Sequence, residues 1–152
     1  MPMTIEEFAV GQEVKTAART VTEADVVGFA GLSGDYNSVH TDAEYCRGTA
    51  FGQRIAHGML VFSIATGLGV RTGVLDGTVL AFLGIEDWKF LKPVFIGDTI
   101  HLRWTVTEAR LSSKPGSGVL KRRMEIVNQR GEVVQSGTTV TLVKSRVGAS
   151  GG

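Results

Sequence analysis

One segment constrains the fold of this chain more than any other: a long apolar stretch near the middle, followed by alternating sequence. From His57 to Val70 the residues would be apolar on nearly every face of a helix. A helix that is apolar all round is a buried one. We therefore predict that the rest of the chain covers this helix.

Beyond residue 79 the sequence takes on the pattern of β-strands. Apolar residues alternate with polar ones, most clearly at Ile100, Leu102 and Trp104. We expect strands over residues 79–91, 99–111, 119–127 and 133–143, and a first strand over 13–20. About five antiparallel strands and one apolar helix predict an α+β fold in which the sheet wraps around the helix.

The first third of the chain predicts a second helix that ends in a loop. Thr22 has the side chain of an N-cap, and Glu23 and Asp25 follow it in the first turn. Residues 33–38 read Ser-Gly-Asp-Tyr-Asn-Ser, a composition typical of loops. The helix therefore ends there, and we expect Asp35 and His40 to lie on one irregular loop.

The 152 residues are enough for one domain, which we expect over residues 1–147, with a flexible tail over 148–152. The single cysteine, Cys46, cannot form an internal disulfide, which favours the cytoplasm. The longest apolar stretch is shorter than the ~20 residues that span a bilayer, so we expect no membrane span. A net charge of +1 lacks the basic excess typical of nucleic-acid binding.

Asp35 and His40 are the first candidates for chemistry. A carboxylate and an imidazole on one loop, beside Asn37, can hold a water molecule between them. Such a pair can remove and return a proton near neutral pH. Taken alone, the spacing Asp-x-x-x-x-His is a weak signal and is more typical of an ordinary surface loop.

His57 and Gly58 are the second candidate feature, because they open the apolar helix. The first N–H groups of a helix have no partner within it, and glycine has no side chain to keep a ligand away. A developing oxyanion could be stabilised there. The alternative is that Gly58 merely permits tight packing.

Other chemistries fit the sequence less well. His40-Thr41-Asp42 has the form of part of a two-histidine, one-carboxylate iron site, but the strand pattern of such a site is missing. Cys46 lies in a helix-like segment over residues 42–47 and is typical of a small apolar residue. No phosphate-binding glycine loop or serine-nucleophile motif is present. We expect no metal and no cofactor.

Three stretches together resemble the MaoC-like, (R)-specific enoyl-CoA hydratases. They are residues 29–40 (FAGLSGDYNSVH), 49–52 (TAFG) and 55–60 (IAHGML), supported by residues 90–98. The resemblance implies the hot-dog fold, a long antiparallel sheet wrapped around one central helix. The chain departs from the family pattern at Ser38, where the family usually has proline, whose fixed φ would stiffen the loop.

The resemblance implies syn addition of water to a trans-2-enoyl-CoA, giving the (R)-3-hydroxyacyl-CoA. Asp35 and His40 would activate the water, and the Gly58 N–H would bind the thioester oxygen. Asn37 and His57 would support them, and Thr66 stands where related enzymes often have a serine. The implied partners are an acyl-CoA and a second copy of the chain, as a homodimer or a dimer of dimers.

Two rival functions remain open: a hot-dog acyl-CoA thioesterase, and a non-catalytic acyl-CoA-binding or dehydratase-partner subunit. The charge pattern bears on the CoA phosphates, because residues 1–100 carry a net −5 and residues 101–152 a net +6. The candidates for phosphate contact are Arg103, Lys114, Lys121, Arg122 and Arg123. For the acyl wall we expect Phe62, Leu68 and the loop over residues 70–79. An ordinary solvated sheet face would explain the same charges.

Overall fold

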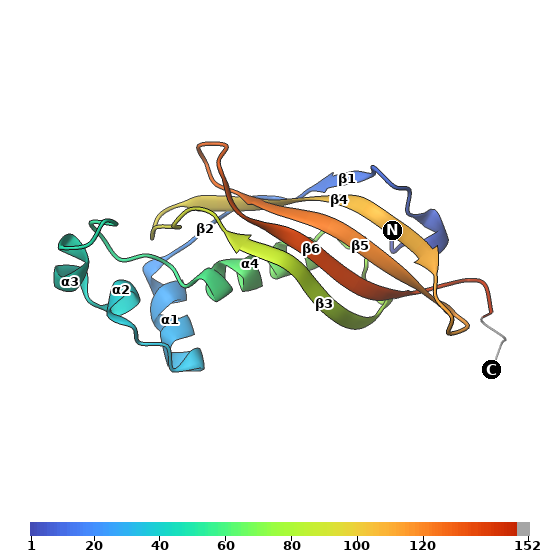
Figure 1. Ribbon diagram of the computed structural model, residues 1–152, viewed down its shortest axis with the longest axis horizontal. Coiled ribbons are helices and arrows are strands. Elements are labelled where there is room, and N and C mark those ends of the chain that lie inside the picture. Colours follow the sequence, from blue (N-terminus) through green and yellow to red (C-terminus); the bar gives the residue numbers. More distant parts are fainter. Residues whose placement is uncertain (149–152) are drawn as a thin grey trace.

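Six antiparallel strands form one curved sheet, and the longest helix lies against one face of it (Figure 1). The computed structural model describes residues 1–148. The order across the sheet is β1-β4-β5-β6-β3, with β2 also paired to β4. The strands are β1 (Glu13–Lys15), β2 (Arg19–Thr20), β3 (Val79–Phe90), β4 (Thr99–Leu111), β5 (Ser117–Val127) and β6 (Val133–Lys144).

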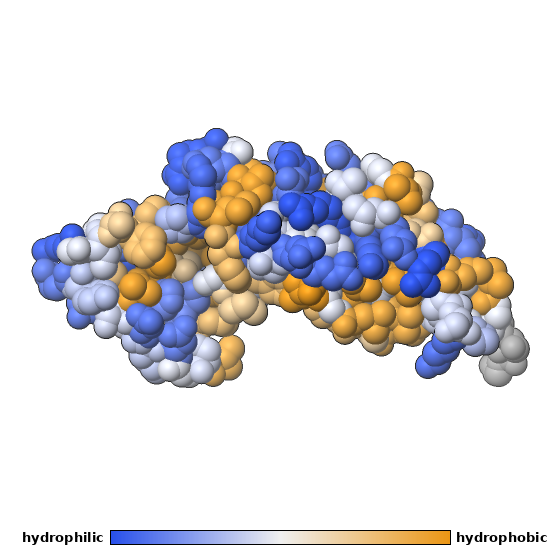
Figure 2. All heavy atoms as spheres, viewed as in Figure 1, coloured by the Kyte–Doolittle hydropathy of each residue, from blue (hydrophilic) through white to orange (hydrophobic). Residues whose placement is uncertain are grey.

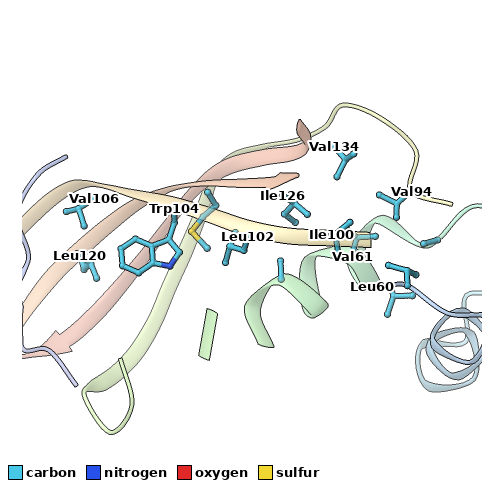
Figure 3. Close-up of a cluster of buried hydrophobic side chains, with 14 of the residues drawn as sticks. Leu60, Val61, Val94, Ile100, Leu102, Trp104, Val106, Leu120, Ile126 and Val134 are labelled. Carbon is cyan, nitrogen blue, oxygen red and sulfur yellow. The ribbon is translucent and has the colours of Figure 1, made fainter. Parts of the chain in front are cut away.

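The core lies between the sheet and the helix α4 (Gly58–Val70). Leu60, Val61 and Ala65 of α4 belong to one buried cluster with Leu102 and Trp104 of β4. Figure 3 shows these strand residues in a row along the side of β4 that faces α4. The predicted α+β class is confirmed, and the arrangement is the hot-dog fold that the resemblance implies.

The expected burial of α4 on all sides is wrong. Its buried residues form one stripe, whereas Met59 and Val70 are 53% and 72% exposed. One sheet covers one side of a helix, so a single copy of the chain leaves the outer side of α4 in water. The all-round apolar pattern therefore indicates a further surface that packs against this helix.

The N-terminal half supplies short elements at both ends of the sheet: a 3-10 helix lies at one end beside β4 and β5, and three α-helices lie around the opposite end (Figure 1). They are η1 (Ile5–Glu7), α1 (Glu23–Ser33), α2 (Ser38–Thr41) and α3 (Ala43–Arg47). The predicted cap is confirmed, because Thr22 Oγ1 accepts a hydrogen bond from the Asp25 N–H at 3.2 Å. The single first strand expected over residues 13–20 is instead two short strands, β1 and β2, both paired to β4.

The strand β3 forms one edge of the sheet and carries exposed apolar residues. They are Val79, Leu80, Phe82, Leu83, Ile85 and Phe90. Figure 2 shows hydrophobic atoms gathered along the edge where β3 lies, beside a hydrophilic face. Among residues 1–148, no helix is both long and apolar enough to cross a bilayer. The tail expected at 148–152 lies, apart from Gly148, outside the described residues.

Candidate active site

The turn after α1 fixes the backbone of Asp35. The helix ends at Gly34, whose φ of 77° is left-handed and suits glycine. The Ser33 hydroxyl then accepts a hydrogen bond from the Asp35 N–H at 3.1 Å. Asp35 Oδ1 accepts another from the Asn37 N–H at 3.2 Å. One carboxylate oxygen is therefore held by the loop, and Oδ2 points toward His40.

His40 lies in the short helix α2 and is buried, so the expectation that it lies in an irregular loop is wrong. Its Nδ1 is 2.8 Å from the carbonyl oxygen of Ile55. A carbonyl oxygen only accepts, so in the neutral ring Nδ1 carries the hydrogen and Nε2 keeps its lone pair. Nε2 lies 3.9 Å from Asp35 Oδ2. His40 is thus set up as a proton acceptor facing a carboxylate.

His57 contacts both Asp35 and His40 and fixes their relative positions. Its ring stacks on the ring of His40 with centroids 3.8 Å apart. Its Nε2–H donates to the backbone carbonyl of Asp35 at 2.9 Å. His57 is also the N-cap residue of α4, so the loop with Asp35 is fastened directly to the start of the central helix.

Gly58 opens α4 at the wall of a cavity of about 390 Å³, which we call the histidine cavity. Its lining includes His40, Gly58, Phe90, Lys92 and Gln135. A Cβ at Gly58 would lie 2.6 Å from Phe90 Cε1, so glycine is required by the close approach of this ring. The Gly58 N–H belongs to the first turn, where a helix offers no acceptor of its own. It is available to a ligand oxygen.

Asn37 and Ser38 build the start of α2. Asn37 is the N-cap, and its Oδ1 accepts a hydrogen bond from the Val39 N–H at 3.3 Å. Ser38 is therefore the first helical residue, a position that favours proline because its N–H has no helical partner. Ser38 stands where the family usually has proline, and serine can adopt the same backbone conformation at this first helical position.

Phe62 and Thr66 do not join Asp35 and His40 within one chain. The Thr66 hydroxyl donates to the Ser63 carbonyl at 2.7 Å and lines a different cavity. Phe62 packs edge-on against Trp88, with ring centroids 4.7 Å apart. Of the expected acyl wall, Leu68 is buried in the core side of α4, and residues of the 70–79 loop line the same cavity as Thr66.

The expected phosphate contacts lie away from the histidine cavity. Arg103 pairs with Glu125, and Lys121 with Glu86. Strand alternation places them, with Arg123, on the face away from α4, and Lys114 lies in the β4–β5 turn. Their contact with CoA phosphates stays a prediction. Lys92, bonded to Glu132, is the cation that sequence reasoning missed, because it stands outside the basic C-terminal third.

Asp35, His40 and His57 could also supply three metal ligands, since one ligating atom from each lies within 4.8 Å of the others. His40 Nδ1 and His57 Nε2 are already bonded to carbonyl groups, which leaves His40 Nε2, His57 Nδ1 and one carboxylate oxygen. Asp42, from the iron-site motif considered above, instead caps α3 through the Tyr45 N–H. The expectation that no metal binds here stays a prediction.

Comparison with known proteins identifies relatives along most of the chain. The family model described as "MaoC like domain" matches residues 6–128. Protein MaoC of Klebsiella aerogenes is 44% identical over 100 residues, which are 66% of this chain and 29% of that protein. The chain thus spans less than a third of that relative.

Two other matches extend over nearly the whole chain. The (R)-specific enoyl-CoA hydratase of Aeromonas caviae is 34% identical over 138 residues, covering 91% of this chain and 97% of that one. A solved structure described as the monoamine oxidase regulatory protein of Archaeoglobus fulgidus superimposes with a TM-score of 0.87. It is 41% identical and covers 95% of each chain.

Proposed function

The chain belongs to the MaoC-like domain family, and we propose that it is a hydratase that adds water to trans-2-enoyl-CoA to give (R)-3-hydroxyacyl-CoA. One observation carries the proposal. The lone pair of His40 Nε2 faces the Asp35 carboxylate across 3.9 Å, and His40 lines the histidine cavity together with Gly58. A base, an orienting carboxylate and an oxyanion donor are the groups that hydration of an enoyl thioester requires.

In the proposed reaction, a water molecule hydrogen-bonds to His40 Nε2 and Asp35 Oδ2. His40 takes one proton as the water oxygen bonds to C3 of the enoyl group. The C2–C3 π electrons move toward the thioester, and its oxygen accepts a hydrogen bond from the Gly58 N–H. The protonated His40 then returns this proton to C2 from the same side, which completes the addition and restores the neutral imidazole. Because both groups lie on one side of the substrate, the addition is syn.

We also propose that the active form is a homodimer joined through β3, or a dimer of two such dimers. An exposed apolar edge strand offers unpaired backbone groups to a second strand. Pairing two copies would also place a second copy beside the uncovered side of α4, where Met59 and Val70 are exposed. The cytoplasm stays the proposed compartment, since Cys46 is a free, buried thiol.

Incubation with crotonyl-CoA separates this function from its two rivals. A hydratase lowers the absorbance of the conjugated enoyl thioester and releases no free thiol. A thioesterase releases CoA thiol, and a non-catalytic subunit changes neither signal. The assay is repeated with EDTA, where we expect unchanged turnover because the proton transfer uses Asp35 and His40 alone. Thiol release in place of hydration would replace the proposal with the thioesterase.

A further inference from the structure

A second cavity, of about 380 Å³, lies between the C-terminal half of α4 and the face of β4, β5 and β6 toward that helix. We call it the arginine cavity. Its lining includes Thr66, Gly69, Trp104, Arg122, Thr139 and Thr141. The exposed loop after α4, including Asp76, forms its rim. It lacks His40 and Gly58 and is therefore distinct from the histidine cavity.

Arg122 occupies a position where the strand pattern calls for an apolar side chain. Its neighbours on the same face of β5, Leu120 and Met124, belong to the hydrophobic core. Among residues 1–148, Arg122 forms no ion pair within 4.0 Å, and its buried Nε has no hydrogen-bond partner. A long contact of 3.5 Å joins its Nη2 to the Thr141 hydroxyl.

Two further polar atoms around this cavity are buried without partners. Within the described part of the chain, Trp104 Nε1 and Thr139 Oγ1 have no hydrogen-bond partner, although both residues are only 1% exposed. The Arg122 guanidinium lies 5.1 Å from the centre of the Trp104 ring, and Arg122 pairs with Thr139 between β5 and β6, so the three residues are neighbours. Burial lowers the pKa of Arg122 to about 10, which leaves it charged at neutral pH. A buried charge with no counter-ion is costly unless a ligand supplies one.

We propose that the arginine cavity binds a carboxylate group, with Arg122 as its counter-ion and Trp104 and Thr139 as further donors. A guanidinium matches a carboxylate with two parallel hydrogen bonds. The apolar remainder of the lining, including Gly69 and Leu102, suits a hydrocarbon chain that leads to this group. This inference rests on the proposed function. The substrate is then an enoyl thioester whose acyl chain ends in a carboxylate, remote from the thioester sulfur.

Pairing of two copies through β3 connects the two cavities. Strands related by a twofold axis run antiparallel, so the Val79 end of one β3 lies beside the Phe90 end of the other. Phe90 borders the histidine cavity and Val79 borders the arginine cavity. In the dimer, the arginine cavity of one protomer therefore adjoins the histidine cavity of its partner. An acyl chain that reacts beside His40 can extend toward Arg122 of the other copy.

The test compares two enoyl-CoA substrates of equal chain length, one ending in a methyl group and one in a carboxylate. We expect the full-length protein to prefer the carboxylate substrate in kcat/KM. Arg122→Gln should lower that preference by about 10- to 100-fold, the scale of a lost charge-assisted hydrogen bond, because it lowers kcat/KM far more for the carboxylate substrate than for the methyl substrate. Arg110→Gln is the matched control, because Arg110 pairs with Glu108 away from both cavities, and it should keep the preference.

Thr139→Val provides a second variant, since the hydroxyl it removes has no partner in the fold. It should lower the same preference by a smaller factor. If Arg122→Gln affects both substrates equally, or neither, Arg122 has only a structural role and the proposal is overturned.

Calorimetric binding separates this proposal from the proposed function. A protein that hydrates neither substrate can still bind the carboxylate-ended acyl-CoA. If Arg122→Gln abolishes that binding, the result supports a carboxylate site in the arginine cavity. Free dicarboxylates from glutarate to sebacate form the other arm, and their binding would identify a free carboxylate as the ligand. Absence of Arg122-dependent binding in both arms would reject the carboxylate site.

Discussion

Asp35 Oδ2 and His40 Nε2 lie 3.9 Å apart, beyond hydrogen-bond distance and close enough for one water molecule to contact both. Three contacts hold the two side chains at this separation. Asn37 holds the carboxylate, the Ile55 carbonyl fixes the His40 ring, and His57 stacks behind that ring. The pair is therefore preorganised for a water molecule.

Removing either member of this pair should abolish most of the activity. We expect Asp35→Asn and His40→Gln each to lower kcat by about 10²–10⁴-fold, the usual contribution of a general acid or base. Asp35 is 52% exposed at its side chain, so its variant should keep the native stability. Because His40 is buried, glutamine is preferable to alanine. Near-normal hydration by either folded variant, checked by circular dichroism, would remove that residue from the mechanism.

Gly58→Ala tests the close approach at the start of α4. The new methyl group meets the Phe90 ring at 2.6 Å, so the ring must move within the histidine cavity. Because Phe90 is 56% exposed and its ring can move aside, we expect a loss of at most ~1 kcal/mol in the free energy of unfolding, the low end for overpacking, and a lower kcat. Adding Phe90→Leu should recover the stability, measured by chemical denaturation. A Gly58→Ala variant as stable and active as the native chain would contradict this close approach.

Arginine in the middle of β3 should separate the two copies of the proposed dimer. Ile85 is 41% exposed near the centre of this edge strand, so a twofold axis there would bring two introduced charges together. We expect Ile85→Arg to be monomeric by analytical ultracentrifugation. Leu32→Arg, on the exposed surface of α1, is the control and should stay dimeric. A dimeric Ile85→Arg would place the interface elsewhere.

Acid should weaken the ion pair between Lys92, which lines the histidine cavity, and Glu132, which directly precedes β6. The hydrogen bond from Lys92, with others from Asn128 and Arg130, lowers the pKa of Glu132 from 4.5 to about 2. The unfolded chain then binds the proton more readily, so this stabilisation is complete above pH 4.5 and is lost as the pH falls toward 2. Glu132→Gln should reduce the pH dependence of the unfolding free energy in that window. Glu44→Gln, at a single exposed ion pair with Arg47, should leave it unchanged.

Local sequence signals predicted the elements of this fold but not their neighbours in the sheet. The Thr22 cap and the strand alternation in β4 are short-range features, and both are present as expected. The position of β3 at an edge depends on pairing with β6, which is remote in sequence. The exposed side of α4 was missed because a pattern of apolar residues does not say which chain covers them.

The sequence likewise predicted those contacts of the site that join residues close along the chain, and not those that join distant ones. Asp35 and His40 are close in sequence, and the fold brings their side chains together. His57 contacts both from 17 or more residues away, and no local pattern shows that contact. Arg122 was grouped with Lys121 and Arg123 by charge alone. Strand alternation was the signal that could have separated it, because its neighbours Leu120 and Met124 face the core.

The product of hydration in D₂O tests the central claim most directly. Crotonyl-CoA is incubated with the protein, and the configuration at C2 and C3 of the product is determined by NMR and chiral chromatography. Because His40 and Asp35 act from one side of the substrate, we predict that deuterium and hydroxyl are added to the same face. The similarity to (R)-specific enoyl-CoA hydratases further predicts the (R)-3-hydroxy product. An (S) product, anti addition, or no hydration by the folded protein would contradict the account.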